Sequence, residues 1–289
     1  MTIPITGHTG FLGLLGHPVS HSISPSMHNE SFRQLGIDCV YLCFDVTEET
    51  LSDAVKGLKL AGIRGFNLTM PCKNKIVELC DELSPAASLA GAVNTVVVEN
   101  DRCIGHNTDG IGFWKSANEA GFFQKGTTIT LMGIGGASTA IAVQAALDGA
   151  KELRIFARPT SRFWNRALQM TRRLNQETQC NVQLFDQNDT CALRMSIASS
   201  QLLINGTSVG MAPNIHDTIL PDTTMFHPKL TVADVIYNPR ETLFLKQAKE
   251  AGCKTFNGMY MLLYQGAEAF RLWTGQEMPT EIIKAKYFA

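Results

Sequence analysis

Short apolar runs alternate with segments of helical periodicity along the first third of the chain. Ser24 followed by Pro25 is typical of a helix start, with Ser24 as the N-cap, and Thr47 predicts the cap of a second helix. The expected elements are strands at 11–16, 40–46 and 65–70 and helices at 25–35 and 48–60. This β-α-β-α-β order predicts a parallel sheet with right-handed crossovers.

The remainder of the chain also alternates strands and helices. Asn100 and Asp101 predict a turn between two paired strands, and a further helix is expected to begin just after Asp109 and to run to about residue 120. The other expected strands are 127–132, 153–157, 182–185, 202–205, 232–236 and 253–256, and the other expected helices are 74–80, one from Ser84, one that ends near 147, 164–178 and 259–273. A chain of 289 residues with this pattern predicts an α/β protein of two domains.

Polar side chains follow the expected strand at 65–70. Asn67 and Thr69 alternate along it and therefore point to the same face. Pro71 ends the strand because it lacks the N–H that a ladder needs, and Lys73 lies in the turn beyond. Ligands of open α/β sheets bind at the carboxyl ends of strands, so this segment is a candidate site. A strand followed by a solvated lysine is the alternative.

The expected helix at 25–35 begins behind two serines. A helix N-terminus offers free N–H groups and the positive end of a dipole, and Ser22 and Ser24 add two hydroxyls. Together they form a candidate site for a small carboxylate. Helix capping alone would account for Ser24 and leaves Ser22 unexplained.

Asp109 is expected at the same sheet edge as Lys73. A carboxylate beside a lysine holds the amine in place and tunes its proton affinity, which favours a catalytic pair. An ordinary N-cap is the alternative role of Asp109. We interpret the neighbouring His106 as structural.

A glycine-rich turn follows the strand at 127–132 and leads into an apolar helix. This order is typical of dinucleotide binding, because glycines let the backbone approach a pyrophosphate at the helix N-terminus. The third small position of the fingerprint holds Ser138 in place of Gly or Ala. A tight turn without a ligand is the alternative. The candidate cofactor-binding residues here are Gly133, Gly135, Gly136, Ala137 and Ser138.

The end of the next strand carries basic residues where NAD enzymes usually place an acid. Arg158 and Arg162, with Thr160 between them, suit a ribose 2′-phosphate because guanidinium groups bind phosphate in a forked geometry. This favours NADP as the cofactor and leaves NAD possible. Solvated surface arginines are the alternative interpretation.

Two later strands end in loops at the same edge of the predicted sheet, where we expect the nicotinamide. The strand at 202–205 leads into a loop of small residues, and the strand at 232–236 leads into Tyr237. Further on, Gln265 stands on a mostly apolar helix, either as a core amide or as a side chain that reaches into a cleft. The candidate cofactor-binding residues of this region are Thr207, Gly210, Met211, Val235 and Gly258.

Composition and charge narrow the class of protein. The chain has 25 basic and 26 acidic side chains, which argues against a general nucleic-acid-binding protein. No apolar run reaches the length of a membrane span, and residues 1–6 lack the basic start and apolar run of a signal peptide. The eight cysteines are scattered without a Cys-x-x-Cys pair, which favours reduced thiols in a cytoplasmic protein over disulfides or zinc. We therefore expect no metal, no nucleic acid and no membrane.

Eight segments of the chain resemble the shikimate dehydrogenase family, including its quinate/shikimate dehydrogenase branch. They occur in the family's order and are HSISPSMHN, NLTMPCK, GAVNT, GHNTDG, GIGGAST, NGTSVGM, DVIYNP and MLLYQGAEAF. The resemblance implies a substrate-binding catalytic domain with a mainly parallel sheet over residues 1–113 and a Rossmann-like NADP-binding domain over 114–256. It also implies C-terminal helices at 257–289 that return to the first domain.

The resemblance implies an activity as well: NAD(P)-dependent interconversion of 3-dehydroshikimate and shikimate, a step toward chorismate and the aromatic amino acids, by a cytoplasmic monomer or homodimer. Hydride goes to the C3 ketone carbon, Lys73 supplies the proton, and Asp109 orients Lys73 and binds a substrate hydroxyl. Ser22 and Ser24 match carboxylate-binding positions of the family. The other residues that match its substrate pocket are Asn67, Thr69, Asn94, Tyr237 and Gln265.

One departure from the family concerns the cofactor. The family usually has Asn-Arg at the end of the second Rossmann strand, where this chain has Ala157 before Arg158. The quinate/shikimate branch often adds an acid there, and its absence here favours NADP over NAD. Quinate or another cyclic hydroxy acid as substrate, and a non-catalytic sensor of shikimate or dinucleotide, are the alternatives. A sensor has no need of Lys73 and Asp109.

Overall fold

The computed structural model describes residues 4–288, which form two compact units. The first unit comprises the residues up to 108 together with those from 263 onward, and the second comprises 109–262. Residues 1–3 and residue 289 lie outside the described residues. The first three belong to the segment examined for a signal peptide, and residue 289 ends the range predicted for the C-terminal helices. Each unit has its own six-stranded sheet, which confirms the predicted α/β class.

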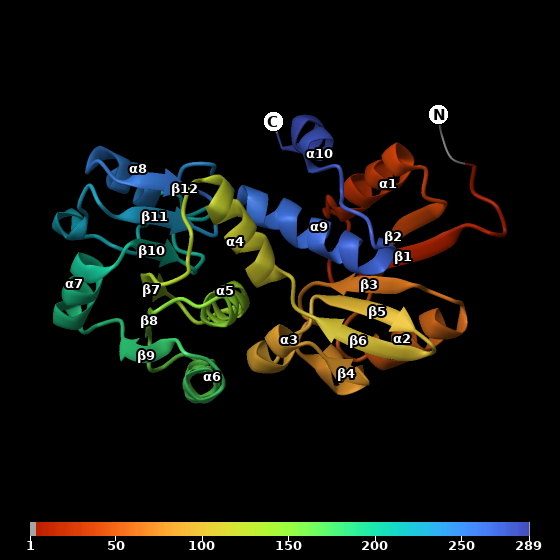
Figure 1. The fold of residues 1–289 in the computed structure, drawn as a ribbon, viewed down its shortest axis with the longest axis horizontal. Helices are drawn as coiled ribbons and strands as arrows, with labels where there is room; N and C mark the ends of the chain where they lie inside the picture. The colour runs from red at the N-terminus through yellow and green to blue at the C-terminus, as the bar shows by residue number, and fades with distance from the viewer. Residues whose placement is uncertain (1–3, 289) are drawn as a thin grey trace. The chain divides into compact units, whose positions relative to one another are not determined.

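The sheet of the first unit is mixed (Figure 1). The elements are β1 Gly10–Gly16, α1 Ser24–Leu35, β2 Cys39–Asp45, α2 Leu51–Leu60, β3 Gly65–Leu68, the 3-10 helix η1 Lys75–Leu79, β4 Glu82–Leu83, α3 Pro85–Ala90, β5 Thr95–Glu99, β6 Arg102–His106, most of α9 Met259–Thr274, and α10 Thr280–Tyr287. The strand order is β2-β1-β3-β5-β6-β4, with β1 parallel to β2 and β3, and β5 antiparallel to β3 and β6. Asn100 and Asp101 have the positive φ angles that a tight hairpin turn needs, as predicted.

Different helices cover the two faces of this sheet. Phe66 belongs to an apolar cluster that includes residues of α2, η1 and α3. The preceding Gly65 faces the other way, where an added Cβ would lie 2.4 Å from the indole nitrogen of Trp273 on α9. Because successive strand residues point to opposite faces, α9 covers the face opposite α2. Asn67, two residues after Gly65, therefore points to the α9 face.

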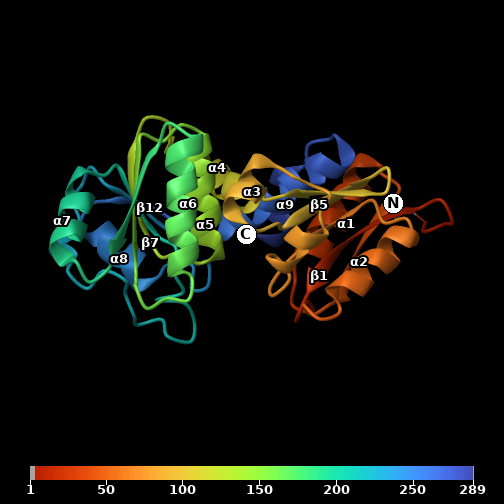
Figure 2. The ribbon, with the colours of Figure 1, turned by 90° about the horizontal axis from the view of Figure 1, so that it is seen from below.

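All strands of the second unit are parallel. The elements are α4 Asp109–Glu119, β7 Thr128–Met132, α5 Gly136–Leu147, β8 Glu152–Ala157, α6 Trp164–Glu177, β9 Asn181–Asp186, α7 Thr190–Ser199, β10 Leu202–Asn205, the 3-10 helix η2 Thr223–Met225, β11 Thr231–Asp234, α8 Leu243–Glu250 and β12 Lys254–Phe256. The order β12-β11-β10-β7-β8-β9 is that of a Rossmann-like sheet, with the switch between β7 and β10. Figure 2 shows α4, α5 and α6 on one face of the sheet and α7 and α8 on the other.

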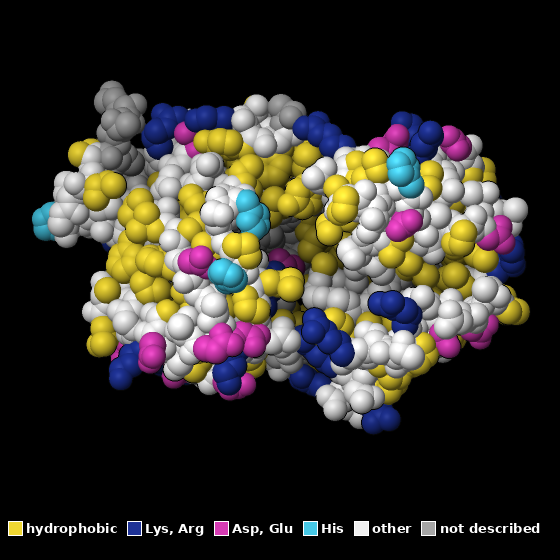
Figure 3. Space-filling model, turned by 180° about the vertical axis from the view of Figure 1, so that it is seen from behind, with side chains coloured by type: hydrophobic (Ala, Val, Ile, Leu, Met, Phe, Trp, Pro, Cys, Tyr) yellow, Lys and Arg dark blue, Asp and Glu magenta, His cyan; other side chains and the backbone are white. Residues whose placement is uncertain are grey.

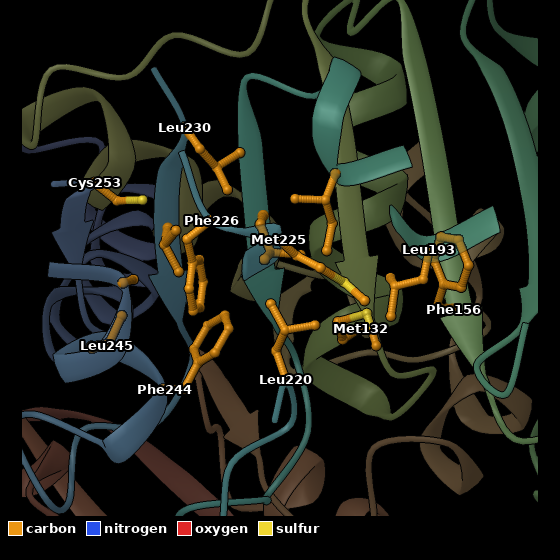
Figure 4. Close-up of a cluster of buried hydrophobic side chains, with 14 residues drawn as sticks. Met132, Phe156, Leu193, Leu220, Met225, Phe226, Leu230, Phe244, Leu245 and Cys253 are labelled. Atoms are coloured by element: carbon orange, nitrogen blue, oxygen red, sulfur yellow. The ribbon is translucent and has the colours of Figure 1, made fainter. Parts of the chain in front are cut away.

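An apolar core lies between this sheet and helices α7 and α8 (Figure 4). It joins Met132 and Phe156 at the ends of β7 and β8 to Leu193 of α7 and to Phe244 of α8. Burying a side chain of this size contributes roughly 1.5–3 kcal/mol. The core therefore fixes the carboxyl ends of the strands, which carry the glycine-rich turn and the later loops.

The predicted cap of α1 is wrong by one residue. Ile23 occupies the N-cap position and Ser24 is the first helical residue. Ile23 already has helical backbone angles, φ −81° and ψ −12°, and its carbonyl oxygen accepts from the Met27 N–H at 3.1 Å. The helix therefore starts one residue earlier than the Ser-Pro signal predicts, while Pro25 remains in the first turn as expected.

The predicted cap of α2 is also wrong. The helix begins at Leu51 behind Thr50, because the preceding residues first form a turn in which the Thr47 N–H donates to Thr50 Oγ1 at 3.1 Å. By contrast, Ser84 caps α3 as predicted and accepts from the Ala87 N–H. The elements not predicted are the two-residue strand β4, the 3-10 helix η2, and helices α7 and α8, whereas α10 lies within the C-terminal helices that the resemblance implies.

Candidate active site

Three amide side chains of the first unit, each expected to bind a substrate hydroxyl, lie next to one another. Asn67 stands on β3, Asn94 precedes β5, and Gln265 lies on α9. The amide nitrogen of Asn67 donates to the Asn94 carbonyl oxygen at 3.1 Å, and that of Asn94 donates to Gln265 Oε1 at 3.3 Å. Asn67 and Asn94 are buried and Gln265 is half-buried. Residues as far as 171 positions apart thus form one polar cluster.

Three further polar side chains, not predicted from the sequence, complete this cluster. Tyr41 on β2 donates to Asn67 Oδ1 at 2.7 Å, and the amide nitrogen of Asn67 also donates to Thr95 Oγ1 at 3.0 Å. The amide nitrogen of Asn94 donates to Thr108 Oγ1 at 2.9 Å, and the backbone N–H of Thr108 donates to Asn94 Oδ1 at 2.8 Å. Thr95 and Thr108 lie inside two of the motifs that carry the family resemblance, so these motifs could have indicated both threonines as residues of the site. Tyr41 lies inside an apolar strand, where nothing in the local sequence marks it.

The cluster leaves defined hydrogen-bonding capacity for a ligand. Both N–H groups of Asn67 donate within the protein, and Oδ1 accepts from Tyr41, so the second lone pair of Oδ1 can accept from a ligand hydroxyl. Burial raises the pKa of Tyr41 well above its ordinary value, although a hydrogen bond with Ser24 opposes this. The phenol therefore keeps the proton that it donates to Asn67. A side chain held on three sides in this way presents a fixed acceptor.

The N-terminus of α1 brings Ser22 and Ser24 together. Ser22 Oγ accepts from the Ser24 N–H at 3.2 Å, and Ser24 is buried. This bond gives Ser22 a structural role that the sequence left open. A hydroxyl that accepts from a backbone N–H still has its own O–H to donate, so both serines remain compatible with a carboxylate ligand.

Lys73 lies in the turn after β3, as expected, whereas Thr69, which was expected on the strand, follows its last residue, Leu68. Both side chains are half-buried. The Thr69 N–H donates to the Leu15 carbonyl oxygen at 2.9 Å, and the Lys73 carbonyl oxygen accepts from the Val93 N–H at 2.8 Å. These backbone bonds tie the turn to β1 and to the segment before β5. The backbone of Lys73 is therefore held independently of its side chain.

Asp109 is the first residue of α4 in the second unit and is 8% exposed. A carboxylate at a helix N-terminus is stabilised by the helix dipole. At the next residue, Gly110, an added Cβ would lie 2.3 Å from the Ala140 carbonyl oxygen of α5. This close packing of α4 on α5 fixes Asp109 within the second unit. The pairing of Asp109 with Lys73 stays a prediction.

A buried histidine lies behind Tyr41. His28 of α1 is 1% exposed, and its ring stacks on that of Tyr41 with centroids 4.4 Å apart and planes at 14°. Phe270 of α9 stacks against His28 at 6.2 Å. Burial lowers the pKa of His28 from 6.5 to about 3, so the ring is neutral near pH 7. The stack holds the phenol of Tyr41 beside Asn67.

The second unit contains a cavity of about 420 Å³ at the carboxyl edge of its sheet. Gly135, Gly136 and Ala137 line it where α5 begins. An added Cβ on either glycine would meet no neighbouring atom within 4 Å, so the backbone is open toward a ligand. The other lining residues come from the loops after β10 and β11 and are Gly206, Thr207, Ser208, Met211, Ala212, Val235, Ile236, Tyr237 and Asn238.

Ser138, the departure from the glycine fingerprint, has a packing role. Its side chain is buried and its hydroxyl donates to the Gly206 carbonyl oxygen at 2.8 Å, which ties α5 to the loop after β10. Gly133 and Gly210 have φ angles of 104° and 94°, which favour glycine. An added Cβ on Gly258 would lie 2.0 Å from a backbone carbonyl oxygen. These residues shape the backbone around the cavity.

Arg158, Thr160 and Arg162 lie between β8 and α6, and all three are exposed. The Ser161 N–H donates to the Arg158 carbonyl oxygen at 2.9 Å, which closes a tight turn. The Arg162 guanidinium lies 4.7 Å from the centroid of the Phe163 ring. Exposed guanidinium groups at the end of the second Rossmann strand suit a phosphate.

Charged side chains of both signs are interspersed over the face that Figure 3 shows. Within residues 4–288, no group of three or more His, Cys, Asp or Glu side chains is placed to hold a metal ion. None of the helices in this described part of the chain has the length and apolar character needed to span a membrane. The eight cysteines are all free thiols.

Comparisons with known proteins place the chain in a family. The model of the shikimate dehydrogenase substrate binding domain matches residues 14–96, and that of the shikimate 5′-dehydrogenase C-terminal domain matches residues 258–286. The shikimate dehydrogenase (NADP(+)) of Listeria innocua is 47% identical over 288 residues, which cover 100% of this chain and 99% of the relative.

Solved structures agree. Shikimate 5-dehydrogenase from Listeria monocytogenes, in complex with shikimate and NAD, superposes with a TM-score of 0.95 at 47% identity over 99% of this chain and 98% of the other. Quinate dehydrogenase from Corynebacterium glutamicum, in complex with NAD, gives a TM-score of 0.84 at 29% identity over 97% and 99%. Two α/β units, the second with a Rossmann-like sheet and a glycine-lined cavity, define a two-domain dinucleotide-binding protein. With these identities over its whole length, the chain belongs to the shikimate dehydrogenase family.

Proposed function

We propose that the protein is a shikimate dehydrogenase that reversibly reduces 3-dehydroshikimate to shikimate with NADP(H), a step of the shikimate pathway toward chorismate and the aromatic amino acids. The observation that carries the proposal is the 47% identity to a shikimate dehydrogenase (NADP(+)) over the whole chain. The polar cluster of the first unit and the glycine-lined cavity of the second supply the groups that this reaction needs.

The first unit supplies most of the substrate-binding groups in this proposal. Shikimate carries a carboxylate and several hydroxyls. The hydroxyls of Ser22 and Ser24, with the N-terminus of α1, bind the carboxylate. A site built to hydrogen-bond hydroxyls rejects analogues that lack them. The remaining proposed substrate contacts are Asn67, Thr69, Asn94, Tyr237 and Gln265.

Reduction of a ketone requires a proton at the carbonyl oxygen. Lys73 is the proposed general acid, and in the reverse direction its amine takes the proton back. Asp109 orients the lysine amine and binds a substrate hydroxyl. A positioned general acid contributes on the order of 10²–10⁴-fold in rate.

The second unit fits a nicotinamide dinucleotide. The open backbone at Gly135 and Gly136 suits a pyrophosphate at the N-terminus of α5, and Arg158 and Arg162 suit the 2′-phosphate of NADP. When bound, the cofactor supplies the hydride. The L. monocytogenes structure is a complex with NAD, so we keep NAD as a second cofactor. The full proposed set is Gly133, Gly135, Gly136, Ala137, Ser138, Arg158, Thr160, Arg162, Thr207, Gly210, Met211, Val235 and Gly258.

We also propose the domain boundaries that the sequence predicts. Residues 1–113 form the substrate-binding catalytic domain, 114–256 the dinucleotide-binding domain, and 257–289 the helices that return to the first. The division of the chain at 108/109 and 262/263 supports boundaries in these regions. We propose a cytoplasmic monomer or homodimer, and the free thiols of all eight cysteines support a reducing compartment.

The central experiment compares initial rates with shikimate and with quinate, each with NADP and with NAD. We expect the highest kcat/KM for shikimate with NADP. The quinate dehydrogenase relative is 29% identical and the shikimate dehydrogenase relative 47%, which favours shikimate over quinate. Absence of shikimate turnover with either cofactor would overturn the proposal.

Replacing Ser22 by alanine tests the carboxylate site. A hydrogen bond to a charged group is worth about 1.5–3 kcal/mol, so S22A should raise the KM for shikimate by about tenfold or more and leave the affinity for NADP unchanged. Ser26, an exposed serine of the same helix, provides the matched control S26A. Equal losses for both ligands would indicate a folding defect and contradict the contact.

Replacing Arg158 by alanine tests the choice of cofactor. Loss of a guanidinium paired with the 2′-phosphate should raise the KM for NADP by about tenfold and change that for NAD little, because NAD lacks this phosphate. Arg172, an exposed arginine of α6, gives the control R172A. If R158A keeps the wild-type ratio of kcat/KM for NADP and NAD, the assignment of Arg158 is wrong.

A further inference from the structure

Two neighbouring parallel strands of the second unit end in a buried polar pair. Asn205 is the last residue of β10 and Asp234 the last residue of β11, and both side chains are 0% exposed. The amide nitrogen of Asn205 donates to Asp234 Oδ1 at 3.2 Å. The pair therefore joins the strands at the carboxyl edge of the sheet, where the glycine-lined cavity lies.

Asp234 also binds the chain that follows it. Its Oδ1 accepts from the Ile236 N–H at 2.9 Å, and its Oδ2 accepts from the Thr242 hydroxyl at 2.7 Å. Thr242 Oγ1 in turn accepts from the Leu245 N–H at 3.3 Å and so caps α8. One carboxylate thus fixes both the start of the loop after β11 and its end at α8.

Asn205 binds the other loop in the same manner. Its Oδ1 accepts from the Thr207 N–H at 3.0 Å and from the Thr207 hydroxyl at 2.7 Å. Its amide nitrogen donates to the Val209 carbonyl oxygen at 3.2 Å. The orientation of the Asn205 amide is set by Asp234, because only the nitrogen end can face a carboxylate.

Both loops line the cavity, through Thr207, Ser208 and Met211 on one side and Val235, Ile236 and Tyr237 on the other. The carboxylate itself is costly to bury: burial raises the pKa of Asp234 to about 6, although its three hydrogen bonds lower the pKa. A position that served packing alone would favour an apolar side chain. The hydrogen bonds of the Asp234 carboxylate instead connect it to the two loops.

We propose that Asp234 is a positioning residue of the cofactor site, which sets the two cavity-lining loops in the arrangement that binds a nicotinamide dinucleotide. The inference rests on the proposed function, since that function assigns the cavity to NADP. Asp234 acts through Asn205, Ile236 and Thr242.

The test uses Asp234→Asn and a matched pair at Thr242. Asparagine keeps the size of Asp234 but removes the charge and replaces one carboxylate oxygen by an NH2 group, so that the Thr242 hydroxyl loses its acceptor. Direct titration should show a Kd for NADP about tenfold higher than that of the wild type, as expected for the loss of a hydrogen bond to a charged group. The KM for shikimate should change less than the Kd for NADP, because most of the proposed substrate ligands are in the first unit and only Tyr237 lies in the loop that Asp234 holds. Thr242→Val should shift the Kd for NADP in the same direction, and Thr242→Ser, which keeps the hydroxyl, should restore it.

Two outcomes would overturn the inference. A wild-type Kd for NADP in D234N, with only the melting temperature lowered, would make Asp234 a structural residue. Equal Kd values for NADP in T242V and T242S would also make Asp234 a structural residue. If D234N fails to fold, this pair of variants tests the inference by itself. Failure of the proposed function is distinguishable, because the wild-type enzyme would then not turn over shikimate, whereas the NADP titrations would still compare the variants.

Discussion

Replacement of Lys73 by alanine is expected to lower turnover on the order of 10²–10⁴-fold, the usual worth of a general acid, while the affinity for shikimate changes less. The backbone bond between the Lys73 carbonyl oxygen and the Val93 N–H does not depend on the side chain. Cys72 and Ile76, which flank Lys73, are buried in the apolar cluster beneath the sheet. The fold should therefore survive the substitution, so that a loss of turnover reports on chemistry.

The size of the effect on kcat distinguishes two roles of the lysine. An anchor stabilises the ground state and the transition state alike, and its loss mainly raises KM. A proton donor acts only in the transition state, and its loss lowers kcat. Because three amides of the polar cluster are already proposed to bind the substrate hydroxyls, we expect Lys73 to contribute the proton.

Two further variants sharpen this experiment. Lys73→Met keeps a similar length without an ionisable group and should be as poor as alanine. Lys75→Ala removes an exposed lysine two residues on, whose amine lies 2.5 Å from a Glu78 carboxylate oxygen, and should keep wild-type turnover. If K73A turns over normally and only its directly measured shikimate affinity falls, Lys73 is an anchor and the proton comes from elsewhere.

The sequence predicts well those features that are local. The glycine-rich turn between β7 and α5 was recognisable because a strand, a turn and a helix follow each other directly. The sequence does not reveal the role of Ser138, because its hydroxyl donates to the carbonyl oxygen of Gly206 in the loop after a distant strand, β10. The cap of α1 was misplaced by one residue because the Ser-Pro signal does not reveal that Ile23 is already helical.

Features made by distant residues were not predictable in the same way. Tyr41 resembles any residue of an apolar strand until β3 pairs next to β1 and brings Asn67 within 2.7 Å of its hydroxyl. Asp234 likewise reads as the polar end of a strand, and its role depends on Asn205 and Thr242. The sequence alone does not decide whether Gln265 is a core amide or reaches into a cleft. Its hydrogen bond with Asn94 depends on the packing of α9 onto the sheet.

Replacement of His28 by phenylalanine is expected to make the free energy of unfolding fall less than that of the wild type when the pH is lowered from 8 to 5. The unfolded chain binds a proton at His28 near pH 6.5, whereas burial lowers the native pKa to about 3. The unfolded state therefore binds more protons below pH 6.5, so this share of the stability is complete above that pH and is lost as the pH falls toward 3. At pH 5 the loss is about 2 kcal/mol.

Phenylalanine offers a flat ring for the contacts with Tyr41 and Phe270, and it removes Nδ1, which has no hydrogen-bond partner among residues 4–288. Denaturant unfolding at pH 8 and pH 5 measures the effect. The wild type should lose about 2 kcal/mol more than H28F between these two values, because the carboxylates that also titrate are common to both proteins and cancel in the comparison. H216Q, which alters an exposed histidine, should behave as the wild type. Identical losses in the wild type and H28F would show that the native state accepts the proton at His28, and hence that the stack behind Tyr41 opens in mild acid.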